Sequence, residues 1–297
     1  MMSSPSKPDW VRARAPSAQT YEHLRELLRQ YSLHTVCQEA HCPNVGECWR
    51  SGTVTFMIMG EICTRACRFC NVKSGKPDGV LDPQEPANVA RAVKELGLRY
   101  VVLTSVDRDD LPDGGAGHFA QTIVAIRSLA PDTLVEALIP DFGGGLAEIQ
   151  AVADVCPDVI GHNLETTRRL TPKVRDPRAD YYKSLRVLEQ VKKLNSKIFT
   201  KSSLMLGLGE EREDVLKALR DLRGVGTDFI TLGQYLRPSA RNLPVMKYVT
   251  PEEFDYYRNV AEEMRFRYVA SGPLVRSSYR AGEYFVQGLV ARTRQAP

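Results

Sequence analysis

The stretch Cys63-Thr-Arg-Ala-Cys67-Arg-Phe-Cys70 places three thiols at a CxxxCxxC spacing, shortly after the apolar run Val54-Thr-Phe-Met-Ile-Met59. The apolar run predicts a buried strand, and the cysteines predict a short loop at its end. Three thiolates in such a loop can hold one side of a four-iron cluster, because Cys thiolate is the usual protein ligand of iron–sulfur clusters. One iron then has no protein ligand and is open to an exchangeable molecule.

Zinc and disulfides are the alternative explanations for these cysteines. Structural zinc takes four closed ligands, and the nearest histidines, His41 and His118, complete no zinc pattern. Three cysteines are an odd number for disulfides, and neighbours in one tight loop strain a bridge. Ligand count and spacing therefore favour an iron–sulfur cluster.

A second group of three cysteines lies upstream at a CxxxxCxxxxxC spacing. Its members are Cys37, Cys42 and Cys48. Pro43, Asn44 and Gly46 predict a loop here, and a loop can turn all three thiols inward. One larger site shared by both groups is an alternative, but each group has a self-contained spacing, so two clusters is the simpler interpretation. We interpret the seventh cysteine, Cys156, as a buried structural thiol.

Composition and charge limit the kind of protein further. The chain has 297 residues and a net charge of +4, without the concentrated basic face of a nucleic-acid binder. No apolar run approaches the roughly 20 residues that span a bilayer. Seven cysteines without a secretory signal indicate a reducing compartment. We expect a cytoplasmic monomer with neither nucleic-acid nor membrane partners.

Apolar periodicity predicts strands and helices that alternate along the chain. The predicted strands are 54–59, 100–104, 134–139, 159–163, 198–206 and 229–236. The predicted helices are 21–31, 86–96, 116–129, 146–155, 180–194, 214–222, 251–266 and 281–291. Such alternation implies right-handed βαβ units and a parallel sheet. We expect an α/β fold, a partial TIM-type (β/α)6 barrel.

The expected barrel covers residues 53–245. An N-terminal extension, residues 1–52, carries the upstream cysteines, and its first 20 residues form an arm without hydrophobic periodicity. A C-terminal extension covers residues 246–297.

Polar side chains mark the strand ends, where the chemistry of parallel barrels gathers. Thr104 and Ser105 end the second strand, before the Asp107-Arg-Asp-Asp110 segment. Three carboxylates and an arginine there are either solvated or hold the cysteine loop and a ligand ammonium group. Glu136 lies in mid-strand, where a carboxylate is costly to bury without a partner, so we interpret it as functional.

Further polar candidates follow on later strands. Asn163 and Glu165 alternate with Leu164, so they share a face and offer acceptors to a ribose diol. The alternative for Glu165 is a helix N-terminal carboxylate. The remaining candidates are Lys201, Gln234, Tyr235 and, in a basic loop suited to a carboxylate, Arg175.

The CxxxCxxC loop, with an aromatic at Phe69, resembles the signature of radical S-adenosylmethionine (SAM) enzymes. That resemblance implies a [4Fe–4S] cluster on Cys63, Cys67 and Cys70, with SAM on the open iron and Phe69 near the adenine. It implies SAM contacts at Thr104, Ser105, Glu136, Asn163, Glu165, Lys201, Gln234 and Tyr235. Thr104 and Ser105 stand where these enzymes usually carry a GGE-type segment.

The two cysteine groups, followed by Arg276-Ser277-Ser278-Tyr279, together resemble the lipoyl synthase family over nearly the whole chain after residue 30. The resemblance implies an auxiliary [4Fe–4S] cluster on Cys37, Cys42 and Cys48. It also implies a fourth ligand from Ser278, with Ser277 as the alternative. Arg175 and Arg276 become candidate substrate contacts, and no side chain beyond the cluster ligands is expected to be catalytic.

The same resemblance implies a reaction and its partners. A 5′-deoxyadenosyl radical removes hydrogen from an octanoyl chain on a lipoyl-carrier domain, and sulfur from the auxiliary cluster enters at C6 and C8. The implied partners are that carrier domain and an electron donor such as ferredoxin or flavodoxin. The rival interpretations are a radical SAM enzyme whose second cluster only transfers electrons, and a plain electron-transfer or zinc protein.

Overall fold

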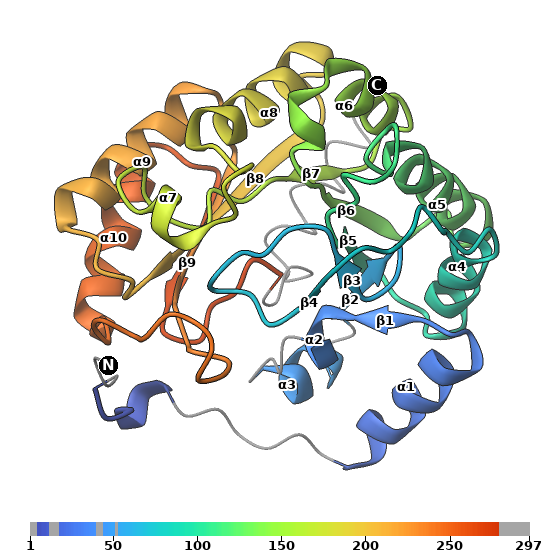
Figure 1. Cartoon of the computed structure of the whole chain (residues 1–297), viewed down its shortest axis with the longest axis horizontal. Helices are drawn as coiled ribbons and strands as arrows, with labels where there is room; N and C mark the ends of the chain where they lie inside the picture. Colours follow the sequence, from blue (N-terminus) through green and yellow to red (C-terminus); the bar gives the residue numbers. More distant parts are fainter. Residues whose placement is uncertain (1–4, 12–17, 40–43, 51–52, 279–297) are drawn as a thin grey trace.

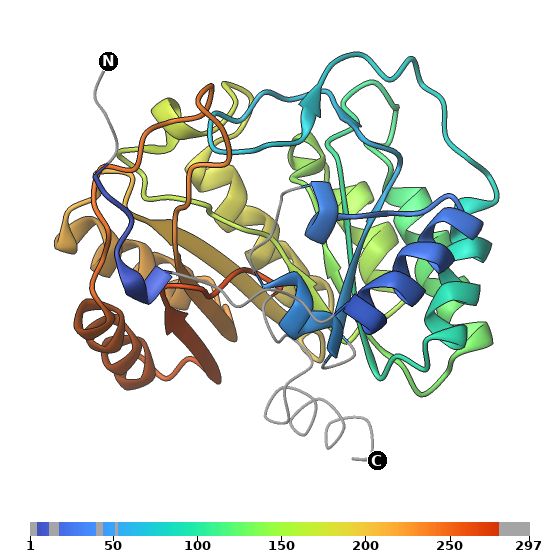
Figure 2. The same cartoon turned by 90° about the horizontal axis from the view of Figure 1, so that it is seen from below.

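The structure of the chain is a computed structural model that describes residues 5–11, 18–39, 44–50 and 53–278 (Figure 1). One sheet of eight strands forms its centre, in the order β1-β2-β5-β6-β7-β8-β9-β10. All neighbours are parallel except β1 and β2, which are antiparallel. Helices follow the strands around the outside of the curved sheet (Figures 1 and 2).

The six strands expected from the sequence are present, which confirms the α/β fold with a mostly parallel sheet. They are β2 (Thr53–Ile58), β5 (Tyr100–Ser105), β6 (Leu134–Leu138), β7 (Val159–Gly161), β8 (Phe199–Leu206) and β9 (Phe229–Gln234). Their carboxyl ends meet at one edge of the sheet, as parallel pairing requires.

The expected helices within the described residues are also present. They are α1 (Ala18–Gln30), α4 (Glu85–Glu95), α5 (Ala116–Leu129), α6 (Leu146–Asp154), α8 (Tyr181–Leu194), α9 (Arg212–Gly224) and α10 (Pro251–Glu263). The structure adds η1 (Asp9–Val11), η2 (Phe142–Gly144) and α7 (Thr171–Val174). The predicted helix 281–291 lies outside the described residues.

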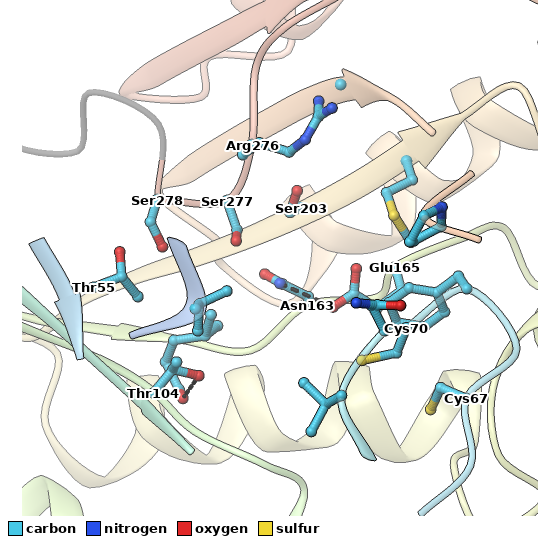
Figure 3. Close-up of a pocket in the computed structure, with 18 of the residues that line it drawn as sticks. Thr55, Cys67, Cys70, Thr104, Asn163, Glu165, Ser203, Arg276, Ser277 and Ser278 are labelled. Atoms are coloured by element: carbon cyan, nitrogen blue, oxygen red, sulfur yellow. Dashed lines mark hydrogen bonds between the residues drawn. The ribbon is translucent and has the colours of Figure 1, made fainter. Parts of the chain in front are cut away.

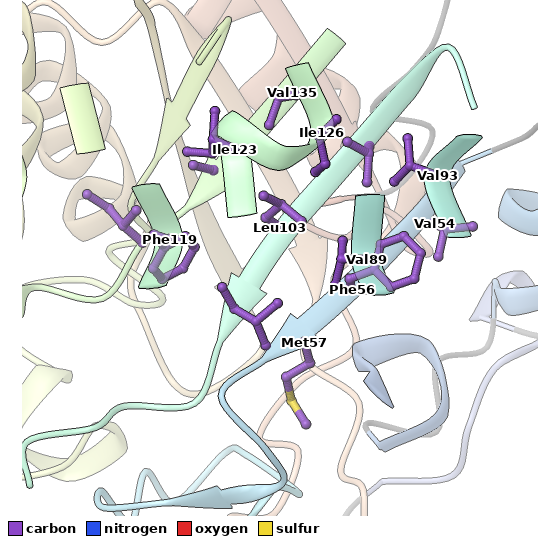
Figure 4. Close-up of a cluster of buried hydrophobic side chains, with 14 of the residues drawn as sticks. Val54, Phe56, Met57, Val89, Val93, Leu103, Phe119, Ile123, Ile126 and Val135 are labelled. Carbon is purple, nitrogen blue, oxygen red and sulfur yellow. The ribbon is translucent and has the colours of Figure 1, made fainter. Parts of the chain in front are cut away.

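One face of β2 packs in the hydrophobic core and the other face lines a cavity. Val54 and Phe56 are buried in the hydrophobic cluster that joins the sheet to Val89 and Val93 of α4 (Figure 4). Burying each such side chain is worth about 1.5–3 kcal/mol. Thr55, between them, faces a cavity on the inner side of the sheet. The period of two in a strand thus separates core from site.

Two strands of the eight-stranded sheet were not expected from the sequence. β10 (Tyr268–Gly272) adds to the sheet in parallel beside β9, and β1 (His34–Thr35) pairs with β2. β10 was missed because it is half-buried and contains Ser271 and Gly272, which dilute the strand signal. Both strands attach chain outside residues 53–245 to the barrel sheet.

The upstream cysteine segment corrects another expectation. It was expected to be a loop, yet two short helices occupy most of it, α2 (Val36–Glu39) and α3 (Val45–Arg50). Cys42 lies outside the described residues, as does His41. Short helices separated by a few residues allow Cys37 and Cys48 to face the same cavity.

Candidate metal centre and its cavity

A cavity of about 560 Å³ opens at the carboxyl ends of the strands. This is within the roughly 300–1,000 Å³ common for small-molecule sites. Its wall combines the upstream cysteine segment, the cysteine loop, the strand ends and the segment after β10 (Figure 3). The thiols that line it are Cys37, Cys48, Cys63, Cys67 and Cys70. Chain segments more than 200 residues apart therefore meet around one space.

The segment from Cys63 to Cys70, called the cluster loop below, connects two short parallel strands. β3 (Ile62–Cys63) and β4 (Lys73–Ser74) close the base of the loop. Backbone N–H groups point at the sulfurs. Cys63 Sγ accepts from the amides of Arg65 (3.4 Å) and Asp107 (3.3 Å), and Cys67 Sγ accepts from the amide of Asp176 (3.3 Å). Such donors stabilise a thiolate.

The free thiols are poor acids in this setting. Burial raises the pKa of Cys63 and Cys67 to about 12 and that of Cys70 to about 11. A coordinated metal cation deprotonates a thiol outright. The loop therefore presents protonated thiols, which a bound metal would convert to thiolates.

The sulfurs of the cluster loop are not arranged as a ready-made site for a single metal ion. One tetrahedral zinc ion, with Zn–S bonds of about 2.3 Å, holds its sulfurs within about 4 Å of each other. Among the described residues, three such donors within 4.8 Å of one another are found only in His34, Glu39 and Glu61. The sulfurs of Cys63, Cys67 and Cys70 therefore do not all lie within 4.8 Å of one another.

A buried ion-pair network fixes the cluster loop to the strand ends. The Arg65 guanidinium contacts Asp109 (2.8 Å) and Asp141 (2.6 Å) through Nη2. Burial opposes charge on Asp141, but the hydrogen bond and the charge of Arg65, with smaller contributions from His162 and Lys183, together outweigh it and lower the pKa of Asp141 to about 2. The Asp107–Asp110 segment thus holds the cysteine loop, one of the two roles considered for it.

A second anchor lies on the other side of the loop. The Ala66 amide donates to Asp176 (2.8 Å), and Arg178 Nη2 donates to the Thr64 carbonyl (2.6 Å). Arg178 also pairs with Asp176 and Asp109. Of these partners only Asp109 was singled out from the sequence, because the contacts that reach the loop and Asp109 join residues 69 to 114 positions apart.

Two hydrogen bonds tie the upstream cysteine segment to the rest of the wall. Asn71 Nδ2, at the end of the cluster loop, donates to the Glu39 carbonyl (3.1 Å). Asn44 Nδ2 donates to the Leu274 carbonyl, beyond β10. These bonds bring the N- and C-terminal extensions to the same cavity.

The candidate serine ligands reach the cavity because of one glycine. Arg276, Ser277 and Ser278 all line it (Figure 3). A Cβ on Gly233 of β9 would lie 2.0 Å from the Val275 carbonyl oxygen. Only a residue without a side chain lets this segment pass so close to the sheet.

The polar residues expected at the strand ends divide into several groups. Thr104 and Ser105 line the cavity, and Ser105 Oγ is buried without a hydrogen-bond partner among the described residues. Asn163 and Glu165 face each other, with Asn163 Nδ2 donating to Glu165 Oε1 (3.0 Å). Glu165 has φ +66°, an uncommon backbone for a non-glycine residue that is typical of functional sites.

The aromatic and amide candidates line the cavity, and two of them also hold the backbone of the cavity wall. Phe69 and Tyr235 line the cavity, and Tyr235 also donates its hydroxyl to the Leu243 carbonyl (2.9 Å). Gln234 lines the cavity too, but its amide is engaged. It donates to the Tyr235 and Lys247 carbonyls and accepts from the Val249 amide.

A polar relay that the sequence did not predict supports Arg175. Arg175 Nη1 donates to Ser184 Oγ (2.8 Å), which lies 2.9 Å from His162 Nε2. His162 Nδ1 is 2.9 Å from the Ile139 carbonyl, so it carries the proton and Nε2 accepts. Burial, then the charge of Arg175, lowers the pKa of His162 to about 4. Arg175 Nε remains buried without a partner among the described residues.

Two expected cofactor contacts are not part of the cavity wall. Glu136 pairs with Lys201 Nζ (2.9 Å) and accepts from the Tyr100 hydroxyl (2.6 Å) inside the barrel. Neither Glu136 nor Lys201 lines the cavity. The interpretation of a mid-strand carboxylate as functional is corrected here, because the buried partner that it needs is Lys201.

Cys156 corrects a second expectation. It is exposed rather than buried, and its backbone has φ +49° in the turn after α6. The apolar sequence around it belongs to the helix before it and the strand after it.

Comparisons with known proteins agree with this geometry. A model described as the radical SAM superfamily matches residues 57–222. A second, described as the N-terminal domain of lipoyl synthase of the radical SAM family, matches residues 2–42. These ranges contain the cluster loop and the first two upstream cysteines.

Curated relatives cover nearly the whole chain. Lipoyl synthase of Thermus thermophilus is 58% identical over 282 residues, covering 95% of this chain and 87% of the relative. Lipoyl synthase of Myxococcus xanthus is 53% identical, covering 99% and 98%. At this level of identity the family is shared along the full length.

Solved structures share the fold at low identity. HydG, a maturase of the [FeFe]-hydrogenase, matches with a TM-score of 0.57 at 15% identity, covering 73% of this chain and 50% of that chain. Streptococcus suis SuiB bound to S-adenosylmethionine matches with a TM-score of 0.57 at 12% identity, covering 86% and 56%. The chain belongs to the lipoyl synthase family of the radical SAM superfamily.

Proposed function

We propose that this protein inserts two sulfur atoms into an octanoyl chain that is attached to a lysine of a lipoyl-carrier domain. The positions are C6 and C8, and the product is the lipoyl group. Its relatives are named lipoyl synthases, and the reaction is the one that the resemblance to this family implies for the matching residues of this chain. The observation that carries the proposal is the single cavity lined by thiols of both cysteine groups and by Ser277 and Ser278.

The cluster loop would hold a [4Fe–4S] cluster through Cys63, Cys67 and Cys70. The supporting observation is that backbone amides donate to the sulfurs of Cys63 and Cys67. When bound, this cluster and SAM supply hydrogen abstraction from an unactivated carbon, which no side-chain acid or base can perform. The protein supplies position and exclusion of water.

Cys37 and Cys48, together with Cys42, would hold the auxiliary [4Fe–4S] cluster, whose sulfide is a substrate of the reaction. Ser278 is the favoured fourth ligand, with Ser277 as the alternative. A serine oxygen is a hard ligand and holds iron less firmly than a thiolate does, which suits an iron that must be given up. A cluster used only for electron transfer has no need of such a ligand.

The remaining wall residues would bind SAM and the substrate. Asn163 and Glu165 offer acceptors to a ribose diol, and Ser105 has a free hydroxyl to donate. Thr104, Phe69, Gln234 and Tyr235 complete this side of the cavity. Arg175, with its unpartnered Nε, and Arg276 would meet carboxylate or carbonyl oxygens.

Anaerobic incubation with SAM, dithionite and an octanoyl-lysyl peptide tests the proposal. Mass spectrometry of the peptide should show two added sulfurs together with 5′-deoxyadenosine in solution. Cleavage of SAM with an unchanged peptide would contradict sulfur insertion. Absence of SAM cleavage in protein that holds about eight irons would contradict the assignment of the cluster loop.

A further inference from the structure

The outer surface of the cluster loop carries positive charge directly over the thiols. Ala66 and Arg68 are exposed, while Cys67, Phe69 and Cys70 between and beside them line the cavity. One layer of chain therefore separates solvent from the candidate cluster on this side.

Three exposed basic residues gather on this layer from three segments. Arg68 belongs to the loop itself, and its Nη1 donates to the carbonyl of Lys173 in α7 (3.2 Å). Arg241, in the segment after β9, donates through Nη2 to the Asn71 carbonyl (3.1 Å). Figure 2 draws the cluster loop, α7 and this segment along the same edge of the molecule.

The charges on this surface are not balanced by nearby carboxylates. Among the described residues, Arg68, Lys173 and Arg241 form no ion pair within 4.0 Å. Asp109 and Asp176, which hold the cluster loop, are already paired with Arg65 and Arg178. A basic surface of this kind attracts an acidic partner and raises the rate of encounter.

We infer that Arg68, Lys173 and Arg241 form the docking surface for a small acidic protein that carries one electron. The inference rests on the proposed function, because it assigns a redox group to Cys63, Cys67 and Cys70. In the step concerned, the carrier is oxidised by one electron and the group held by the three thiols is reduced by one. No proton or bond is exchanged across the surface.

The alternative occupant is the octanoylated carrier domain, and a two-by-two assay separates the two. The variant with Lys173→Glu and Arg241→Glu is compared with the wild type. The reductant is either reduced flavodoxin or dithionite. Each reductant is combined with either an octanoyl-lysyl peptide or an octanoylated carrier domain as the substrate. The rate with flavodoxin should fall about tenfold, the scale of electrostatic steering. The rate with dithionite should stay within about twofold, for both substrates, since a small reductant needs no docking surface.

A matched control reverses two exposed basic residues at the opposite edge of the sheet. Arg99 and Lys197 stand just before β5 and β8 at their amino ends. Arg99→Glu with Lys197→Glu changes the net charge equally and should leave the rate with flavodoxin within about twofold. The iron content of every variant is measured first. If the variant with Lys173→Glu and Arg241→Glu has lost iron, the variant with Lys173→Gln and Arg241→Gln is used in its place.

Salt gives a readout without any substitution. Raising ionic strength from about 0.05 M to about 0.3 M should slow the wild-type reaction with flavodoxin and not with dithionite, because screening acts on exposed charges. Equal losses with both reductants at full iron content would overturn the docking surface, as would no loss at all. A loss seen only with the carrier domain, whichever the reductant, would assign the surface to the substrate instead. Activity with dithionite tests the proposed function separately.

Discussion

At the scale of single residues, the cluster loop depends on one guanidinium. Arg65 and Asp141 are nearly inaccessible, with side-chain exposures of 4% and 0%. Removing one member of a buried pair leaves an uncompensated charge, which typically costs about 3–5 kcal/mol. Arg65→Gln should therefore lower the free energy of unfolding by that amount, measured by urea denaturation of the protein before iron is loaded.

The partner variant provides the control for Arg65. Asp141→Asn combined with Arg65→Gln removes both charges, so its loss should be smaller than the sum of the two single losses. Strictly additive losses would show that the pair does not act as a unit.

His162 gives the site a dependence on pH. Burial, then Arg175, lowers its pKa from 6.5 to about 4. The unfolded chain therefore binds a proton in a range where the folded chain does not, so stability is lost as pH falls from about 6.5 to about 4. The loss is about 3 kcal/mol at the lower end. Unfolding free energies of wild type and His162→Asn, measured between pH 7 and pH 5, should converge as pH falls; parallel curves would contradict a neutral His162.

Residue-scale prediction from sequence succeeded where the signal is local. The cysteine spacing lies within eight residues, so the loop was visible at once. Glu136 was misassigned because Lys201, its partner, is 65 residues away. Arg65 was overlooked for the same reason, since Asp141 is 76 residues away.

At the scale of elements, β9 and the segment after β10 form a close crossing at Gly233. Gly233→Ala would force the Val275 backbone away from the sheet and move Ser277 and Ser278 from the cavity. We expect this variant to lose about one iron per chain, the one that the serine would hold, because three thiolates can hold the other irons, as proposed for the cluster loop. Iron and sulfide analysis of anaerobically reconstituted protein measures the effect.

The matched control for Gly233 is Gly224→Ala at the end of α9. A Cβ at Gly224 would contact nothing within 4 Å and its φ is not positive. The control should keep full iron and gain slight stability from helix propensity. Full iron in Gly233→Ala as well would refute a role for the crossing.

The sequence predicted the repeating strands and helices of the barrel well. It predicted the elements outside the barrel poorly. The six alternating strands follow from apolar periodicity over long segments. β10 and the short helices α2 and α3 do not, because their form depends on contacts with β9, Leu274 and the cluster loop. Tertiary contacts override weak local preference in such short pieces.

At the scale of the whole molecule, three distant parts of the chain share one space. The N-terminal extension, the barrel and the segment after β10 meet at the carboxyl edge of the sheet, joined by Asn71 to Glu39 and Asn44 to Leu274. No helix of the described residues is long and apolar enough to cross a bilayer. The sequence alone placed both cysteine groups, but only the fold brings them to a single cavity.

The central claim is that one group of thiols serves radical generation and the other serves sulfur supply across that cavity. Parallel assay of 5′-deoxyadenosine and sulfur-bearing peptide in Cys42→Ala tests it most directly, with Cys67→Ala as the control. The account predicts that Cys42→Ala still cleaves SAM but adds no sulfur, whereas Cys67→Ala does neither. Formation of the lipoyl product by Cys42→Ala would contradict it.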